Sequence, residues 1–203
     1  MKYRRVLLAA VHAISIILGA HALREFILVD GPSGWTPDPG TFRYFTVDSN
    51  LLALLSSLLV LLSWRRAGRP APRWLWVVRL MAASGLALTC GMVMAVLAPI
   101  RGYGYMLDGP DLHLHLICPL LHILSFVLLE GEAGVPLRCA LWGLLPPTIY
   151  GVVYMVNVVA LRRWSDFYFL NEGGRWLPNG LLALLAVAVL SLALWAGNRR
   201  RAA

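Results

Sequence analysis

Charged residues are scarce in this chain of 203 residues, and long polar stretches are absent. Asp, Glu, Lys and Arg together make up 14% of the sequence, hydrophobic residues make up 59%, and mean hydropathy is +0.70. An average soluble domain carries about 25% charged residues, so this composition excludes a soluble globular protein. The three cysteines fall within or at the edge of apolar runs and provide neither a disulfide framework nor a thiolate metal site. Any chemistry must therefore take place in or beside a bilayer.

The sequence contains instead six long apolar runs. Each is close to the about 20 residues with which a helix crosses about 30 Å of hydrocarbon. The runs cover residues 6–28, 44–62, 75–99, 112–129, 137–160 and 177–195. The remaining segments are too short for a separate catalytic or nucleotide-binding domain. The sequence therefore predicts an all-α polytopic membrane protein, with residues 1–203 forming a single six-transmembrane-helix bundle.

The basic residues are divided unevenly between the two sides of this arrangement. Of the 18 Lys and Arg residues, 12 belong to the side of the termini and 6 to the other side. The larger group comprises Lys2, Arg4, Arg5, Arg65, Arg66, Arg69, Arg73, Arg79, Arg138, Arg199, Arg200 and Arg201. This asymmetry predicts cytoplasmic termini in a multi-pass protein of the plasma membrane. Because the basic residues flank spans and do not gather on one groove, we expect no nucleic-acid partner.

The first span also has features of a cleavable signal peptide. A basic start is followed by an apolar run and by the small-residue pattern Ala20-His21-Ala22. The length of the apolar run favours a span that is retained.

The positions of polar side chains within the spans indicate where a functional site could lie, because a central charge costs about 2.5 to 3.5 kcal/mol in hydrocarbon. They gather in the half away from the termini, and the other half is expected to be nearly bare. At helical spacing they form one stripe on each of the second, fourth and fifth spans. The stripes are Thr46, Asn50, Ala53 and Ser57; Asp111, His115, Cys118, His122 and Ser125; and Pro147, Tyr150, Tyr154 and Asn157. We expect these stripes to face one another around an outward-facing polar cavity.

Only one of His113 and His115 can face such a cavity, because two residues along a helix rotate a side chain by about 200°. His115 is the expected one, since it shares its stripe with Asp111 and His122. A histidine that is simply hydrogen-bonded inside the bundle is an equally simple explanation.

Simple structural explanations also exist for the other polar residues. Thr46, Asp48 and Asn50 are of the types that cap a helix start. Tyr154 and Asn157 are of the types that form hydrogen bonds between helices. The functional interpretation gains support because the second-span stripe continues to Ser57, which capping does not require.

Two connections on the outer side are long enough to cover the cavity. Residues 30–43 are rich in glycine and proline and are expected to form an irregular crossing loop. Residues 162–176 are too polar to span and strongly aromatic, which indicates a segment lying in the membrane interface.

Three segments carry a family resemblance: Phe42–Leu52 (FRYFTVDSNLL), Leu112–Leu121 (LHLHLICPLL) and Trp164–Asn171 (WSDFYFLN). They resemble the Pr6Pr family of six-span membrane proteins. That family is similar to the androgen-induced-protein group, which hydrolyses fatty acid esters of hydroxy fatty acids. The resemblance implies an intramembrane site in which Thr46 and His115 match the threonine and histidine of that group. The spacing from His115 to Pro119 agrees with the Pr6Pr pattern and is one residue shorter than in the hydrolases.

The implied chemistry is physically reasonable. A threonine hydroxyl becomes a nucleophile when a neighbouring base accepts its proton, and a histidine within hydrogen-bond reach can do so. Asn50 is then a candidate donor to the oxyanion, and Asp111 or Tyr154 is a candidate to orient the imidazole. The supporting and cavity residues are Asn50, Asp48, Asp111, His122, Tyr154 and Asn157.

We therefore expect an intramembrane hydrolase or acyl transferase that acts on a lipid ester, with membrane lipids as partners and no cofactor. The alternative is a noncatalytic protein that binds or transports a lipid or small molecule in the same cavity, and a purely structural role is a further one. A metal site is a weaker interpretation, because His115 and His122 lie about 10.5 Å apart along a helix.

Overall fold

The structure, a computed structural model, describes residues 2–31, 34–63, 72–130 and 135–199. Within this part of the chain, six helices are long and apolar enough to cross a membrane: Val6–Ile27, Phe45–Ser63, Arg73–Arg101, Gly109–Leu129, Leu137–Ala160 and Trp176–Arg199. The all-α, six-span fold of a multi-pass membrane protein is thus confirmed. The largest difference from the predicted bounds is at the end of the sixth span, which extends from residue 195 to Arg199.

Three of the six spans are built from more than one helical element. The first, second and sixth are single helices, α1 (Lys2–Ile27), α2 (Phe45–Ser63) and α9 (Trp176–Arg199). The third consists of α3 (Arg73–Met92), a π-helical turn η2 (Val93–Leu97) and α4 (Ala98–Arg101). The fourth consists of α6 (Gly109–Leu112), a π turn η3 (His113–Ile117), α7 (Cys118–Leu124) and a π turn η4 (Ser125–Leu129). The fifth consists of a 3₁₀ helix η5 (Leu137–Leu144), α8 (Leu145–Met155) and a π turn η6 (Val156–Ala160).

The π turn η3 has a cause in the sequence. Pro119 lacks an N–H group, and its ring clashes with the carbonyl group four residues earlier, that of His115. The Cys118 N–H donates instead to the carbonyl of His113, five residues back. The fourth span is therefore wound more openly at the level of His115, and such π turns frequently occur at functional sites.

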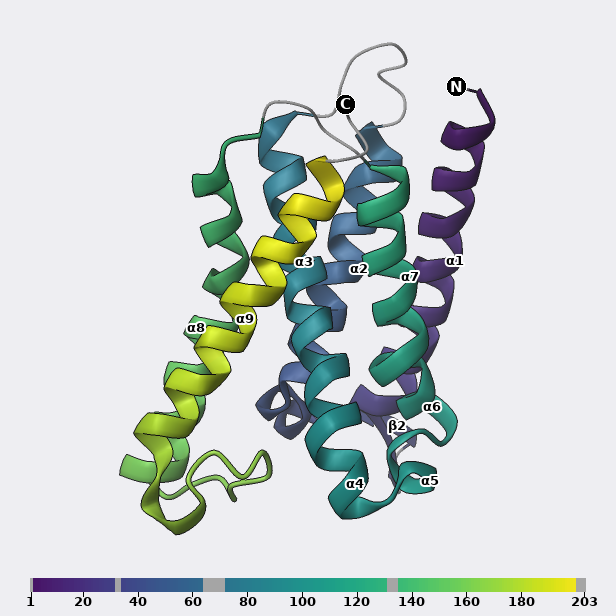
Figure 1. The fold of residues 1–203 in the computed structure, drawn as a ribbon. Helices are drawn as coiled ribbons and strands as arrows, with labels where there is room; N and C mark the ends of the chain where they lie inside the picture. The colour runs from purple at the N-terminus through teal and green to yellow at the C-terminus, as the bar shows by residue number, and fades with distance from the viewer. Residues whose placement is uncertain (1, 32–33, 64–71, 131–134, 200–203) are drawn as a thin grey trace.

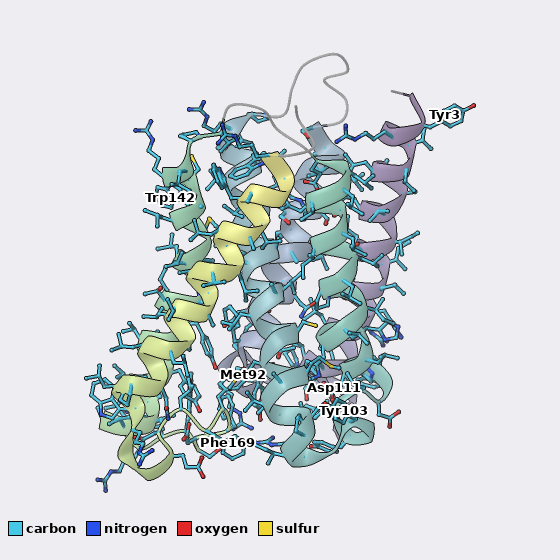
Figure 2. All side chains as sticks on the ribbon, viewed as in Figure 1. Tyr3, Met92, Tyr103, Asp111, Trp142 and Phe169 are labelled. Carbon is cyan, nitrogen blue, oxygen red and sulfur yellow. The ribbon has the colours of Figure 1, made fainter. Side chains whose placement is uncertain are left out.

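Helix α3 lies at the centre of the bundle. It packs against α2, α7, η5 and α9, while α1 packs against α2 and α7 on one side (Figure 1). The start of α1 and the end of α9 lie at the same end of the bundle, which we call the termini end. The opposite end carries α4, α5 (Tyr103–Met106) and the segment that joins the fifth and sixth spans. Figure 2 labels Tyr103, Asp111 and Phe169 at this opposite end, far from Tyr3.

The connection between the first two spans is more regular than expected. It contains an antiparallel hairpin of β1 (Leu28–Gly31) and β2 (Gly34–Pro37), with Val29 opposite Thr36, followed by a 3₁₀ helix η1 (Pro39–Arg43). The expectation of an irregular loop over residues 30–43 was wrong, because β-branched residues at paired positions favour strands.

The fifth and sixth spans approach each other and α3 closely near the termini end. Gly143 in η5 is buried, and a Cβ atom at this position would collide with the hydroxyl oxygens of Ser191 on α9 and Ser84 on α3. Ser191 cannot simply turn away, because its hydroxyl donates a hydrogen bond of 2.6 Å to the carbonyl of Ala140. Only a glycine permits this approach.

Gly143→Ala is therefore expected to destabilise the bundle by about 1–3 kcal/mol through overpacking. The measurement is the unfolding midpoint of the purified protein in detergent. Gly91→Ala is the matched control, because a Cβ at Gly91 meets no heavy atom within 4 Å. Equal midpoints for the two variants would contradict the close packing described here.

Candidate functional site

Thr46 and His115 meet at the opposite end of the bundle. The Thr46 Oγ1 atom in the first turn of α2 lies 3.4 Å from the His115 Nε2 atom in η3. Both side chains are buried, with 6% and 5% of their surface exposed. The two residues lie near the starts of spans that begin from the same side, so they have a similar depth. His115 belongs to the π turn η3, which faces α2 at this level.

The other ring nitrogen of His115 is held by the protein. Its Nδ1 atom lies 2.8 Å from the carbonyl oxygen of Met106 and 3.7 Å from the Asp111 carboxylate. A carbonyl oxygen only accepts hydrogen bonds, so Nδ1 carries the proton and Nε2 presents its lone pair to Thr46. This is the tautomer that a general base for the Thr46 hydroxyl requires.

Thr46 also lines a cavity of about 390 Å³ between α2, the third span, α8 and α9. The hydroxyl-bearing residues of its wall are Thr46, Thr89, Thr148, Tyr150 and Tyr168, and the rest of the wall is aliphatic, aromatic, methionine, proline or glycine. No charged side chain belongs to the wall. The volume and the mostly apolar lining are typical of a small-molecule or lipid site with a few orienting polar groups.

The expected polar cavity between the second, fourth and fifth spans is not the one that forms. The stripes of the second and fourth spans bond directly to each other, as when the Asn50 amide donates to the carbonyl of Leu114 at 3.0 Å. Polar groups in an apolar surrounding are stabilised by such direct pairing. The cavity lies instead on the other side of α2, where helices five and six meet the third span.

The remaining predicted site residues are separated. Asn50 donates both to Leu114 and, at 2.8 Å, to the Thr46 carbonyl, so its amide is already used and the expected oxyanion role is wrong. Asp48 is half-buried in the first turn of α2.

The fifth-span residues also lie apart from His115. Tyr154 donates to Asp166 at 2.8 Å and does not orient the imidazole. The Asn157 amide donates to the Val153 carbonyl, and neither Tyr154 nor Asn157 lines the cavity.

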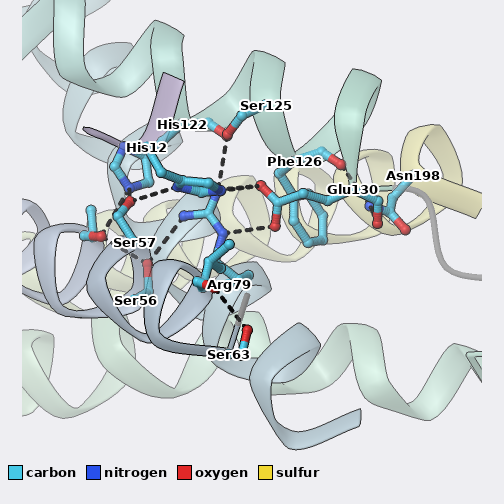
Figure 3. Close-up of polar contacts among 12 residues, drawn as sticks. His12, Ser56, Ser57, Ser63, Arg79, His122, Ser125, Phe126, Glu130 and Asn198 are labelled. Carbon is cyan, nitrogen blue, oxygen red and sulfur yellow. Dashed lines mark hydrogen bonds and ion pairs between the residues drawn. The ribbon is translucent and has the colours of Figure 1, made fainter. Parts of the chain in front are cut away.

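A second polar cluster lies toward the termini end, where the bundle was expected to be nearly bare. The Arg79 guanidinium forms a bidentate ion pair with the Glu130 carboxylate and donates to the hydroxyls of Ser56 and Ser125 (Figure 3). Arg79 is only 1% exposed, although the charge pattern predicted it to flank the third span. A cation six residues inside the third span is stable because these acceptors surround it.

Two histidines extend this cluster across the first, second and fourth spans. The Ser57 Oγ atom lies 3.0 Å from both His12 Nδ1 and His122 Nε2, and His12 Nε2 lies 3.4 Å from Glu130 Oε1. The order serine, histidine, glutamate resembles a catalytic triad. However, none of these residues lines the cavity, and Ser57 and His12 are 0% and 1% exposed. A reacting atom has no room there, so the cluster joins helices and His122 is not a cavity residue.

The ion pair changes the titration of Glu130, which lies just beyond the end of the fourth span. Burial alone would raise its pKa, but the charge and hydrogen bonds of Arg79 outweigh burial and hold the pKa well below the ordinary value of 4.5. The folded protein therefore binds the Glu130 proton more weakly than the unfolded chain. The pair contributes stability above the ordinary glutamate pKa, and that contribution is lost as the pH falls below it.

His12, Arg79 and Glu130 were missed as members of a buried site. One signal was present, because a histidine and an arginine inside apolar runs require partners. Among the described residues, no group of three or more His, Cys, Asp or Glu side chains is placed to hold a metal ion.

Comparison of the chain with protein-family models, curated proteins and solved structures finds no match.

Glu130→Gln is expected to lower the free energy of unfolding by about 3 kcal/mol, because it leaves the buried Arg79 charge without a counter-charge. Chemical unfolding in mixed micelles measures the change. Glu172→Gln serves as the control at an exposed glutamate and is expected to stay within about 0.5 kcal/mol. If the two variants unfold alike, the ion pair does not stabilise the bundle.

Proposed function

We propose that this protein is an intramembrane hydrolase or acyl transferase that acts on a lipid ester, with Thr46 as nucleophile and His115 as general base. The observation that carries the proposal is that the Thr46 hydroxyl lies 3.4 Å from His115 Nε2 and that Thr46 lines an apolar cavity of about 390 Å³. The same residue is thus next to a base and at a space large enough for an acyl chain.

The reaction follows from this arrangement. The Thr46 oxygen attacks the ester carbonyl while its proton passes to His115 Nε2, and the carbonyl π electrons move onto oxygen. When the tetrahedral intermediate collapses, the ester C–O bond breaks and the leaving alkoxide takes the proton from His115. Water, or an acceptor alcohol in a transferase, then repeats the sequence on the acyl-threonine. The present distance is slightly longer than the about 2.6–3.2 Å of a tight catalytic hydrogen bond, as is common before substrate binds.

We also propose the membrane and orientation in which this protein lies, and the family to which it belongs. Cytoplasmic termini in the plasma membrane are supported by the 12 to 6 division of basic residues, of which Arg65, Arg66, Arg69, Arg200 and Arg201 lie outside the described residues. Membership of the Pr6Pr family is supported by the three motifs, two of which contribute Thr46 and His115.

A noncatalytic lipid-binding or transport protein is the second candidate. The observation that favours it is the composition of the cavity wall, which offers hydrocarbon contact and few polar groups. This candidate requires the cavity but not the proton transfer from Thr46 to His115. Covalent labelling therefore separates the two functions.

An alkyl fluorophosphonate is expected to label the wild-type protein on the peptide that contains Thr46, as detected by mass spectrometry. Thr46→Ala and His115→Ala should each abolish labelling, because one lacks the nucleophile and the other its base. Thr46→Ser keeps a hydroxyl and should retain it. Thr41→Ala, at a buried threonine that lies in η1 outside the cavity wall, is the control. Binding of the lipid probe without a covalent adduct would favour the noncatalytic candidate.

Gly151→Leu is expected to reduce the cavity without disturbing the fold, because Gly151 belongs to the wall and a Cβ there meets no heavy atom within 4 Å. Turnover of p-nitrophenyl decanoate should fall about tenfold or more, while turnover of the acetate should change little. Gly91→Leu, equally open but outside the wall, is the control. An equal loss for both esters would show that the acyl chain does not occupy this cavity.

A further inference from the structure

The proposed reaction leaves one requirement without an assigned group, namely a donor for the oxyanion. Asn50 is committed to two carbonyl groups. The donor must instead come from the polar part of the cavity wall, close to Thr46. There the Thr89 hydroxyl is 2.9 Å from the Ser49 hydroxyl, and the Tyr150 hydroxyl donates at 2.6 Å to the carbonyl of Arg43.

Tyr168 meets the requirement. Its side chain belongs to the cavity wall, and its hydroxyl oxygen accepts a hydrogen bond of 2.9 Å from the Phe45 N–H, the residue directly before Thr46. The Phe45 N–H uses this oxygen as an acceptor and does not consume the hydroxyl proton. The hydroxyl also forms side-chain hydrogen bonds with Tyr150 and Thr46, which place it beside the hydroxyl that would react. Burial raises the pKa of Tyr168 to about 12, and hydrogen bonds with Phe45, Tyr150 and Thr46 limit the rise, so the hydroxyl is protonated at neutral pH.

The Phe45 N–H also strengthens this donor. It lies at the amino end of α2, where free N–H groups carry partial positive charge. A hydroxyl that accepts a hydrogen bond becomes a better donor in turn, since successive hydrogen bonds polarise one another.

The surrounding segment fixes the tyrosine in place. The Tyr168 N–H donates at 3.1 Å to the hydroxyl of Tyr154, which itself donates to Asp166. The Asp166 carboxylate also accepts from the N–H groups of Leu170 and Asn171, at 3.0 and 2.7 Å. These contacts hold the ring before any substrate arrives, as electrostatic stabilisation of a transition state requires.

Backbone strain occurs at the same turn. Phe169, the next residue, has a φ of 58°, in the left-handed region that a bulky side chain rarely adopts. Such a conformation is strained and persists when the surrounding contacts impose it. The strained turn is part of the fold that places Tyr168 against the start of α2.

We propose that the Tyr168 hydroxyl is the hydrogen-bond donor that stabilises the oxyanion formed when Thr46 attacks an ester. As the Thr46 oxygen bonds to the carbonyl carbon and its proton moves to His115, negative charge develops on the carbonyl oxygen. The Tyr168 O–H donates to that oxygen and keeps its own proton. This inference rests on the proposed function, and it adds a catalytic residue from the segment between the fifth and sixth spans.

Tyr168→Phe removes the hydroxyl and keeps the ring. With p-nitrophenyl decanoate as substrate, kcat is expected to fall about 100- to 1,000-fold while KM changes little, because the lost interaction exists only in the transition state. The rate of fluorophosphonate labelling should fall as well. Tyr44→Phe is the matched control, a tyrosine whose ring packs on Phe167 but which does not line the cavity.

The outcomes are distinguishable. If Tyr168→Phe retains wild-type kcat while Thr46→Ala abolishes labelling, this inference is overturned and the proposed function stands. If wild-type protein neither turns over ester nor reacts with the probe, both are overturned. A purely structural role for Tyr168 would instead lower the unfolding midpoint and raise KM together, which also contradicts the inference. A kcat loss with unchanged KM and midpoint supports it.

Discussion

The ion pair between Arg79 and Glu130 is the constraint on which the rest of the bundle depends. Neither charge is stable in an apolar surrounding without the other, so the third and fourth spans must meet at this level. The hydroxyls and imidazoles around the pair draw the first and second spans to the same place. The termini end is thereby joined by polar contacts, whereas the fifth and sixth spans meet the third around an apolar cavity.

Two similar sets of residues, one at each end of the bundle, differ in their surroundings. Both ends of the bundle hold a hydroxyl next to a histidine, and at the termini end a glutamate completes a triad-like order. The difference lies in access. Ser57 is fully buried and does not line the cavity, whereas Thr46 lies next to a histidine and lines the cavity. Free volume, and not the residue types, distinguishes a candidate active site from a structural contact here.

The sequence predicts the six spans well, because length and hydropathy alone determine which segments can cross a bilayer. It also brings Thr46 near His115, since both start spans from the same side. The position of the cavity could not be read from polar stripes, because those on the second and fourth spans pair with each other and the void is lined by apolar side chains. Arg79 was misread for a related reason, since near a span end a cation that flanks the membrane and one buried in an ion pair look alike.

Helix α9 contributes seven of the cavity-lining residues, from Trp176 to Val187, whereas the Thr46 and His115 pair needs only the second and fourth spans. During synthesis the amino-terminal parts of a chain fold first. The two residues of the proposed catalytic pair are therefore synthesised and inserted before the helix that completes the wall of the cavity. The cavity thus depends on the last span to be made, whereas the contact between Thr46 and His115 does not.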